Sequence, residues 1–182
     1  MHKPSSKEPS LGVQTIEYFD EERQRPIVVE LWYPAETQGG GNSFSENSPW
    51  VHPKEARDAP FIKNGQKSPL ILFSHGHQGE RRDLSWLAAS LTKEGYFVAA
   101  IDHDGDMRSH FDIQKSVRFW NRSIDFSFLL NQLEQDGNLK EKIDFSRVGF
   151  VGYSLGGMTG LQLAGAKASP VSYTHLTLPT KA

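Results

Sequence analysis

The sequence has 182 residues, of which 37% are hydrophobic and 23% charged, a composition typical of a folded globular domain. Its net charge of -2 gives no electrostatic reason to expect nucleic acid or an anionic membrane surface as a partner. The absence of cysteine excludes disulfides, cysteine-ligated zinc and a thiol nucleophile.

The amino-terminal part of the chain predicts a flexible lead-in followed by a hairpin. Residues 1–10 are polar, and no apolar run approaches the ~18 residues of a membrane span, so we expect a cytoplasmic protein without an integral membrane segment. Residues 13–18 and 27–32 are β-rich and flank a polar turn, which predicts two antiparallel strands. The long polar segment 34–68 is interpreted either as a cover near an active site or as a disordered excursion.

The middle of the chain alternates between buried strands and helices. Residues 69–73 and 96–101 are continuous apolar runs, typical of strands that are covered on both faces of a parallel sheet. Apolar residues at helical spacing predict helices over 83–94, which Gly95 ends, and over 117–133, with Trp120, Ile124, Leu129 (or Phe128) and Leu133 on its buried face. With a further strand at 148–151 and a helix after it, this order predicts one α/β domain built on a mostly parallel sheet.

The strand at 148–151 leads into Gly152-Tyr153-Ser154-Leu155-Gly156, a G-x-S-x-G pattern. In a strand-turn-helix context this pattern holds the serine in a strained backbone conformation above the sheet, where its hydroxyl can act as a nucleophile. A glycine-rich turn of a nucleotide-binding fold is the alternative, but its G-x-G-x-x-G fingerprint would need glycine in place of serine. Ser154 is therefore the candidate nucleophile.

Acyl transfer also needs two backbone N–H groups aimed at the developing oxyanion. Leu155 supplies one, because the first amides of a helix have no partner within the helix. The second is expected from the loop His75-Gly76-His77-Gln78-Gly79, which follows the strand at 69–73, and we assign it to the amide of His77. The alternative is that this loop is only a glycine-rich turn. His75 is interpreted as a structural residue that orients the loop.

Aspartates alternate with other residues from Asp102 to Asp106. This spacing suggests a calcium loop, but Met107 and Ile113 stand where the EF-hand pattern requires Gly and Glu, so no metal site is predicted. His103, Asp104 and His110 follow a strand end and are candidate residues of the substrate pocket. A solvated polar loop is the alternative.

Four segments together resemble the α/β-hydrolase superfamily, and within it the group of type II platelet-activating-factor acetylhydrolase and the bacterial dienelactone-hydrolase-like esterases. They are residues 30–34 (Glu-Leu-Trp-Tyr-Pro), 73–76 (Phe-Ser-His-Gly), 95–103 (Gly-Tyr-Phe-Val-Ala-Ala-Ile-Asp-His) and 152–157 (Gly-Tyr-Ser-Leu-Gly-Gly). The resemblance implies hydrolysis of a small or short-acyl carboxylic ester without a metal or an organic cofactor. It implies Ser154 as nucleophile within the turn Gly152, Tyr153 and Gly156, and the amides of His77 and Leu155 as oxyanion donors.

The carboxyl-terminal part departs from the family pattern, in which an acid and then a histidine follow the serine. No Asp or Glu follows Ser154, and the one later histidine, His175, lies in a segment (171–180) that resembles the translation of a sequencing-library adaptor. We therefore expect residues 11–169 to be the amino-terminal part of the domain, 170–182 to be a non-native tail, and the 182-residue chain to be nearly inactive and poorly soluble. A catalytically silent binding protein, or an acyltransferase or perhydrolase using the same serine, are the alternative functions.

Overall fold

The computed structural model describes residues 10–36, 55–63 and 65–167. The chain enters the fold through β1 (Ser10–Asp20) and β2 (Arg25–Ala35), which pair along their full length as an antiparallel hairpin, as predicted. Both strands extend beyond the predicted runs, and Ser10, expected in the lead-in, already belongs to β1. The rest of the lead-in, residues 37–54 of the long polar segment, and the tail from 168 lie outside the described residues.

The remaining strands are β3 (Ala56–Arg57), β4 (Ser68–Ser74), β5 (Phe97–Ile101) and β6 (Ile143–Gly152), and the described sheet has the order β3-β1-β2-β5-β4-β6. β4 pairs in parallel with both β5 and β6, and β3 in parallel with β1, whereas β2 joins β5 antiparallel. The predicted α/β class with a mostly parallel sheet is confirmed. Because β4, β5 and β6 point the same way, the segments that follow them meet at one end of the sheet.

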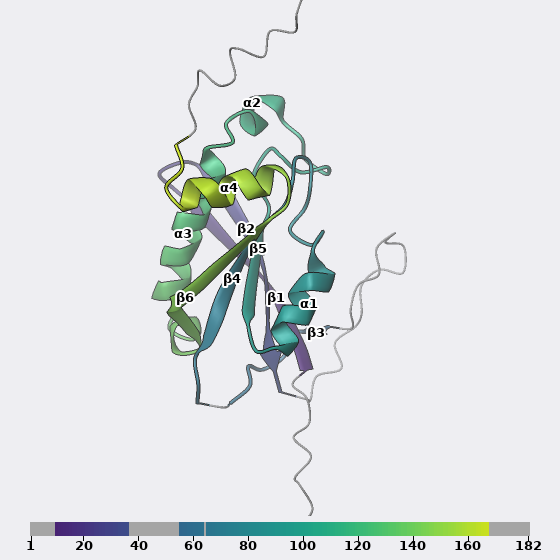
Figure 1. Cartoon of the computed structure of the whole chain (residues 1–182), viewed down its shortest axis with the longest axis vertical. Coiled ribbons are helices and arrows are strands. Elements are labelled where there is room, and N and C mark those ends of the chain that lie inside the picture. Colours follow the sequence, from purple (N-terminus) through teal and green to yellow (C-terminus); the bar gives the residue numbers. More distant parts are fainter. Residues whose placement is uncertain (1–9, 37–54, 64, 168–182) are drawn as a thin grey trace, which may run out of the picture.

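Helices cover both faces of this sheet (Figure 1). α1 (Ser85–Lys93) lies on one face, and α3 (Asn121–Gln135) lies on the other. α4 (Leu155–Leu163) follows β6 directly and crosses the end of the sheet. Gly95, predicted to end the first helix, has φ +93°, the left-handed conformation usual after a helix end. Two short helices, α2 (Ile113–Ser116) and the 3-10 turn η1 (Leu139–Glu141), were not predicted.

The alternation of side chains along the central strands produces two apolar cores. In β5, Phe97, Ala99 and Ile101 belong to the core under α3, while Val98 and Ala100 belong to the core under α1. All five are buried, as expected for a strand covered on both faces. The sheet is thus held rigidly between two helix layers, and the loops at its carboxyl end start from fixed positions.

The predicted buried face of the second long helix is wrong in part. On α3, Leu129 and Leu133 are buried as predicted, but Ile124 and Trp120, the N-cap residue, are exposed. Phe126 and two charged residues described below complete the buried face.

The described part of the predicted cover, residues 55–63, packs on the β1–β2 hairpin through Phe61, whose ring centroid is 4.4 Å from that of Tyr33. Phe61 also lies 5.9 Å, centroid to centroid, from Phe97 at the start of β5, so it packs at the amino end of that strand and not at the carboxyl end of the sheet. Residues 37–54 lie outside the described residues, so the role of the long segment as a cover stays a prediction.

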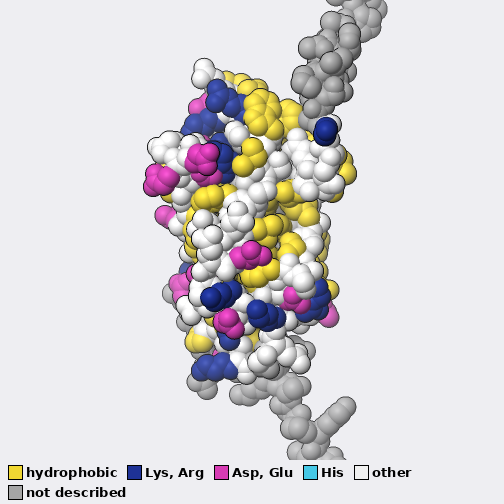
Figure 2. All heavy atoms as spheres, turned by 90° about the vertical axis from the view of Figure 1, so that its left-hand side faces the viewer, with side chains coloured by type: hydrophobic (Ala, Val, Ile, Leu, Met, Phe, Trp, Pro, Cys, Tyr) yellow, Lys and Arg dark blue, Asp and Glu magenta, His cyan; other side chains and the backbone are white. Residues whose placement is uncertain are grey.

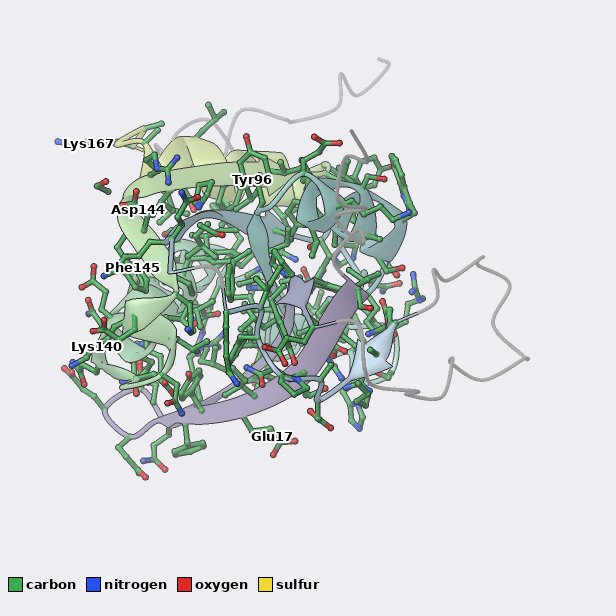
Figure 3. All side chains as sticks on the ribbon, turned by 90° about the horizontal axis from the view of Figure 1, so that it is seen from below. Glu17, Tyr96, Lys140, Asp144, Phe145 and Lys167 are labelled. Atoms are coloured by element: carbon green, nitrogen blue, oxygen red, sulfur yellow. The ribbon has the colours of Figure 1, made fainter. Side chains whose placement is uncertain are left out.

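β6 forms the other edge of the described sheet. Seen along the long axis, the start of β6 with Asp144 and Phe145 lies on a different side of the molecule from Glu17 of β1 (Figure 3). The face that carries β6 and α3 shows apolar side chains among charged ones (Figure 2), and Val148 of β6 is 40% exposed. An open, partly apolar edge strand is a template for association with other chains, in line with the expected poor solubility.

Candidate active site

The turn between β6 and α4 carries Ser154 in an unusual backbone conformation. Its φ and ψ are 53° and -118°, a combination that L-residues rarely adopt. The residue is exposed and stands at the N-cap of α4, at the carboxyl end of β6. No hydrogen bond of the Ser154 hydroxyl to another side chain occurs within the described part of the chain. The serine is therefore presented outward, and among the described residues nothing binds its hydroxyl.

Two glycines make this turn sterically feasible. A Cβ atom on Gly152 would lie 2.2 Å from the carbonyl carbon of Gly156, and a Cβ atom on Gly156 would lie 2.1 Å from the carbonyl oxygen of Ser74. Both obstacles are backbone atoms, which cannot rotate away. The start of α4 can thus lie against the ends of β6 and β4 only because these two positions lack side chains.

The loop after β4 lies against the serine. A Cβ atom on Gly76 would be 3.4 Å from Cβ of Ser154, and the Tyr153 N–H donates to the Ser74 carbonyl at 3.2 Å. The loop closes with a hydrogen bond from the Gly79 N–H to the Gly76 carbonyl at 3.1 Å, and Gln78 has φ +54°. These features are typical of a type II turn. The two segments that the sequence analysis selected, around His77 and around Leu155, are therefore neighbours.

His75 is a buried part of this loop, as expected. Its Nε2 accepts the backbone N–H of His103 at 3.1 Å, so the ring proton must sit on Nδ1, which donates to the Gly76 carbonyl at 2.7 Å. Burial lowers the pKa of His75, and the adjacent Arg122 guanidinium lowers it further. The ring stays neutral and both nitrogens bind backbone, which suits a residue that shapes the loop.

A comparison with protein-family models matches residues 69–179 to the family described as alpha/beta hydrolase fold. The match runs from β4 through the Ser154 turn and covers more than half of the chain. The chain belongs to the α/β-hydrolase fold family. Among solved structures, a ferulic acid esterase from Streptomyces cinnamoneus superposes with a TM-score of 0.68 at 23% identity, covering 90% of this chain and 57% of that one.

Curated relatives of this α/β hydrolase include two platelet-activating factor acetylhydrolases and a cutinase. The acetylhydrolase of Canis lupus familiaris is 27% identical over 72% of this chain and 42% of its own length, and that of Bos taurus is 33% identical over 44% and 19%. Cutinase est1 of Thermobifida alba is 26% identical over 58% of this chain and 35% of its own length. The chain thus spans less than half the length of the curated relatives it matches.

Apart from Ser154, a serine, a histidine and an aspartate lie in line inside the fold. Ser74 Oγ is 2.8 Å from His103 Nε2, and His103 Nδ1 is 3.6 Å from a carboxylate oxygen of Asp125. All three side chains are buried, with His103 1% exposed against the ring of Phe126. Burial lowers the pKa of His103 well below its ordinary value, and Arg122 adds to this effect. No substrate can reach this cluster, so it is part of the interior.

The three candidate pocket residues do not all lie in one pocket. Asp104 and His110 line a cavity of about 250 Å³ together with Arg81, Asp102 and Met107, beside the start of β2. The prediction that His103 joins them is wrong, because its ring is held in the core by Ser74 and Phe126. Ser154 and His77 are not among the residues that line this cavity. Within the described residues, no group of His, Asp and Glu side chains is arranged to hold a metal ion.

Three charged residues below the loop are buried although the sequence did not predict it: Arg122 and Asp125 of α3, and Asp106 of the loop after β5. Arg25 binds Asp125 through two hydrogen bonds, at 3.0 and 2.9 Å. Burial alone would raise the pKa of Asp125, but His103 and Arg25 lower it by more, to about 2. The sequence did contain a signal for the two residues of α3, because positions 122, 125, 126, 129 and 133 recur at helical spacing and so share one face of the helix.

Within the described residues, the structure has no helix that is both long and apolar enough to cross a lipid bilayer.

Proposed function

We propose that this chain carries the nucleophile and the oxyanion donors of a serine carboxylesterase that acts on small or short-acyl esters. The observation that carries the proposal is the backbone of Ser154, with φ 53° and ψ -118° at the start of α4, exposed and beside the Gly76–Gly79 loop. Such a turn is the nucleophile elbow of α/β hydrolases. The relatives named as acetylhydrolase, cutinase and ferulic acid esterase support ester substrates.

In the proposed reaction, Ser154 Oγ attacks the ester carbonyl carbon while a histidine takes the hydroxyl proton. The negative charge that develops on the carbonyl oxygen is stabilised by the N–H groups of His77 and Leu155. The bond to the alcohol oxygen then breaks, and the alcohol leaves with the proton from the histidine. Water attacks the acyl-serine with the same histidine as base and releases the acid.

We assign the histidine and its acid partner to no residue of this sequence. After Ser154 the sequence contains no Asp or Glu, and His175 lies outside the described residues. Loss of the base in a related triad enzyme lowers turnover by about 10⁶-fold. We therefore expect very slow turnover by the 182-residue chain, and fast turnover by a longer protein in which native sequence stands in place of residues 170–182.

The test is labelling with a fluorophosphonate probe, located by peptide mass spectrometry, in both proteins. We expect the label on Ser154, at a much higher rate in the longer protein, and its loss in Ser154→Ala. The buried Ser74 provides the matched control, because Ser74→Ala should leave labelling in place. A folded longer protein without label on Ser154 would instead indicate a catalytically silent hydrolase fold. Product analysis with a competing alcohol or peroxide distinguishes hydrolysis from acyl transfer or perhydrolysis.

A further inference from the structure

The loop that bears the proposed oxyanion donor is held from below by one arginine. Arg122, on α3, is 3% exposed. Its Nη1 donates to the carbonyl of His75 at 2.8 Å, and its Nη2 donates to the carbonyl of Gly76 at 3.2 Å. A planar guanidinium that binds two successive carbonyls fixes the orientation of both peptide groups at once.

Asp106 completes the support from the neighbouring loop. It is 2% exposed and its Oδ2 accepts from Arg122 Nη2 at 3.1 Å. Its Oδ1 accepts the Gln78 N–H at 3.3 Å and lies 2.7 Å from His77 Nδ1. Ser116 holds the same oxygen through its hydroxyl at 2.8 Å. The ion pair therefore binds the loop at four consecutive residues, through Arg122 at His75 and Gly76 and through Asp106 at His77 and Gln78.

Because the peptide group between Gly76 and His77 is trans and planar, hydrogen bonds that fix the Gly76 carbonyl also fix the direction of the His77 N–H. The Gly76 carbonyl receives hydrogen bonds from Arg122, from the His75 ring and from the Gly79 N–H. The N–H of His77 belongs to the same peptide group and points in the opposite direction. It makes no hydrogen bond within the described part of the chain. Since Arg122 is buried and Ser154 is exposed, this N–H points away from the interior.

We infer that Arg122 is a positioning residue that pre-orients the His77 amide toward the oxyanion of a substrate bound at Ser154; this inference rests on the proposed function. An arginine is unfavourable at a position that only needs to be packed. Burying a guanidinium costs several kcal/mol of desolvation, a cost that a packed apolar side chain does not have. Burial lowers the pKa of Arg122 to about 10, against the opposing effect of Asp106, so the guanidinium is charged at neutral pH.

The kinetic test compares Arg122→Lys and Arg122→Met with Arg118→Met, an exposed arginine close by in the chain, in the protein that shows Ser154-dependent labelling. Loss of an oxyanion donor lowers kcat by about 10² to 10³-fold, and we expect Arg122→Met to approach this range with KM changed by less than about 3-fold. Lysine keeps the positive charge but lacks the planar guanidinium that binds two carbonyls at once, so Arg122→Lys should recover part of the rate lost in Arg122→Met. A folded Arg122→Met variant with kcat within 2-fold of wild type would overturn the inference.

A second measurement separates this inference from the proposed function. Backbone ¹⁵N relaxation of His77 in the longer protein does not depend on catalysis. We expect a rigid amide in wild type, with an order parameter of about 0.85, and a value below about 0.6 in Arg122→Met but not in Arg118→Met. An unchanged order parameter in the Arg122 variant overturns the positioning role, whereas absent labelling of Ser154 in a protein with the expected relaxation overturns only the esterase proposal.

Discussion

Replacing Gly156 by alanine tests the close approach on which the Ser154 turn depends. The new Cβ atom would lie 2.1 Å from the Ser74 carbonyl oxygen, whereas ordinary contacts begin near 3.4 Å. The start of α4 would have to move by roughly 1 Å, and the interior is packed too densely to absorb this without strain. Overpacking costs about 1 to 3 kcal/mol, and we expect the upper end because the obstacle is backbone.

For a chain of this length, about 3 kcal/mol corresponds to a melting temperature roughly 6 to 12 °C lower, measured by circular dichroism. Labelling of Ser154 should fall by about 10²-fold, since a displacement of about 1 Å has this effect on a reacting group. The adjacent Gly157 is the matched control. A Cβ atom there would make only an ordinary contact, at 3.5 Å from the Gly152 carbonyl, so Gly157→Ala should be neutral or slightly stabilising. Equal melting temperatures for the two variants would refute the reasoning.

Three further predictions concern the interior and the open edge. Asp125 has a pKa of about 2 in the folded protein, below its ordinary 3.8. Its contribution of about 2 kcal/mol to the free energy of unfolding is therefore complete above pH 3.8 and disappears as pH falls toward 2. Urea unfolding should show this loss of stability in wild type and not in Asp125→Asn. On α3, Leu129→Ala should lower the unfolding free energy by about 2 to 5 kcal/mol and Ile124→Ala by less than about 1, because only Leu129 is buried. At the β6 edge, Val148→Lys should reduce aggregation in light scattering with little change in melting temperature; unchanged aggregation would show that association occurs elsewhere.

The elements that the sequence predicted well have local signals. The hairpin of β1 and β2 is marked by two β-rich runs around a polar turn, and β4 and β5 by continuous apolar runs. The G-x-S-x-G pattern also acts locally, because its glycines determine how closely α4 can approach the strands. Each of these features is decided by steric or hydrophobic properties of fewer than about ten residues, which the sequence displays directly.

The positions of the apolar residues alone do not show which face of α3 is buried. Two choices of stripe were available, and the one containing Trp120 and Ile124 is the more apolar at its amino-terminal end. Leu129 and Leu133 belong to both stripes, and the structure turns Arg122 and Asp125 inward in place of Trp120 and Ile124. Arg122 and Asp125 can be buried because they find partners from distant segments, the loop carbonyls at 75 and 76 and the side chain of Arg25. A charged residue can be buried only when such partners are present, and they are separated from it by 46 to 100 positions in the sequence.

The two ends of the described sheet differ in a way that supports a site at the carboxyl end. At the start of β6, the end of the sheet is closed by apolar side chains, Leu133, Leu139 and Ile143. At the opposite end, β4 and β5 run into Ser74, His75, Asp102 and His103, all buried and polar. Buried ion pairs add little stability compared with apolar packing, so stability alone does not explain why they gather at one end. Ligands of α/β sheets bind outside the carboxyl ends of the strands, where fixed loop geometry is required. The buried charges lie where Ser154 and its neighbouring loop need a rigid base.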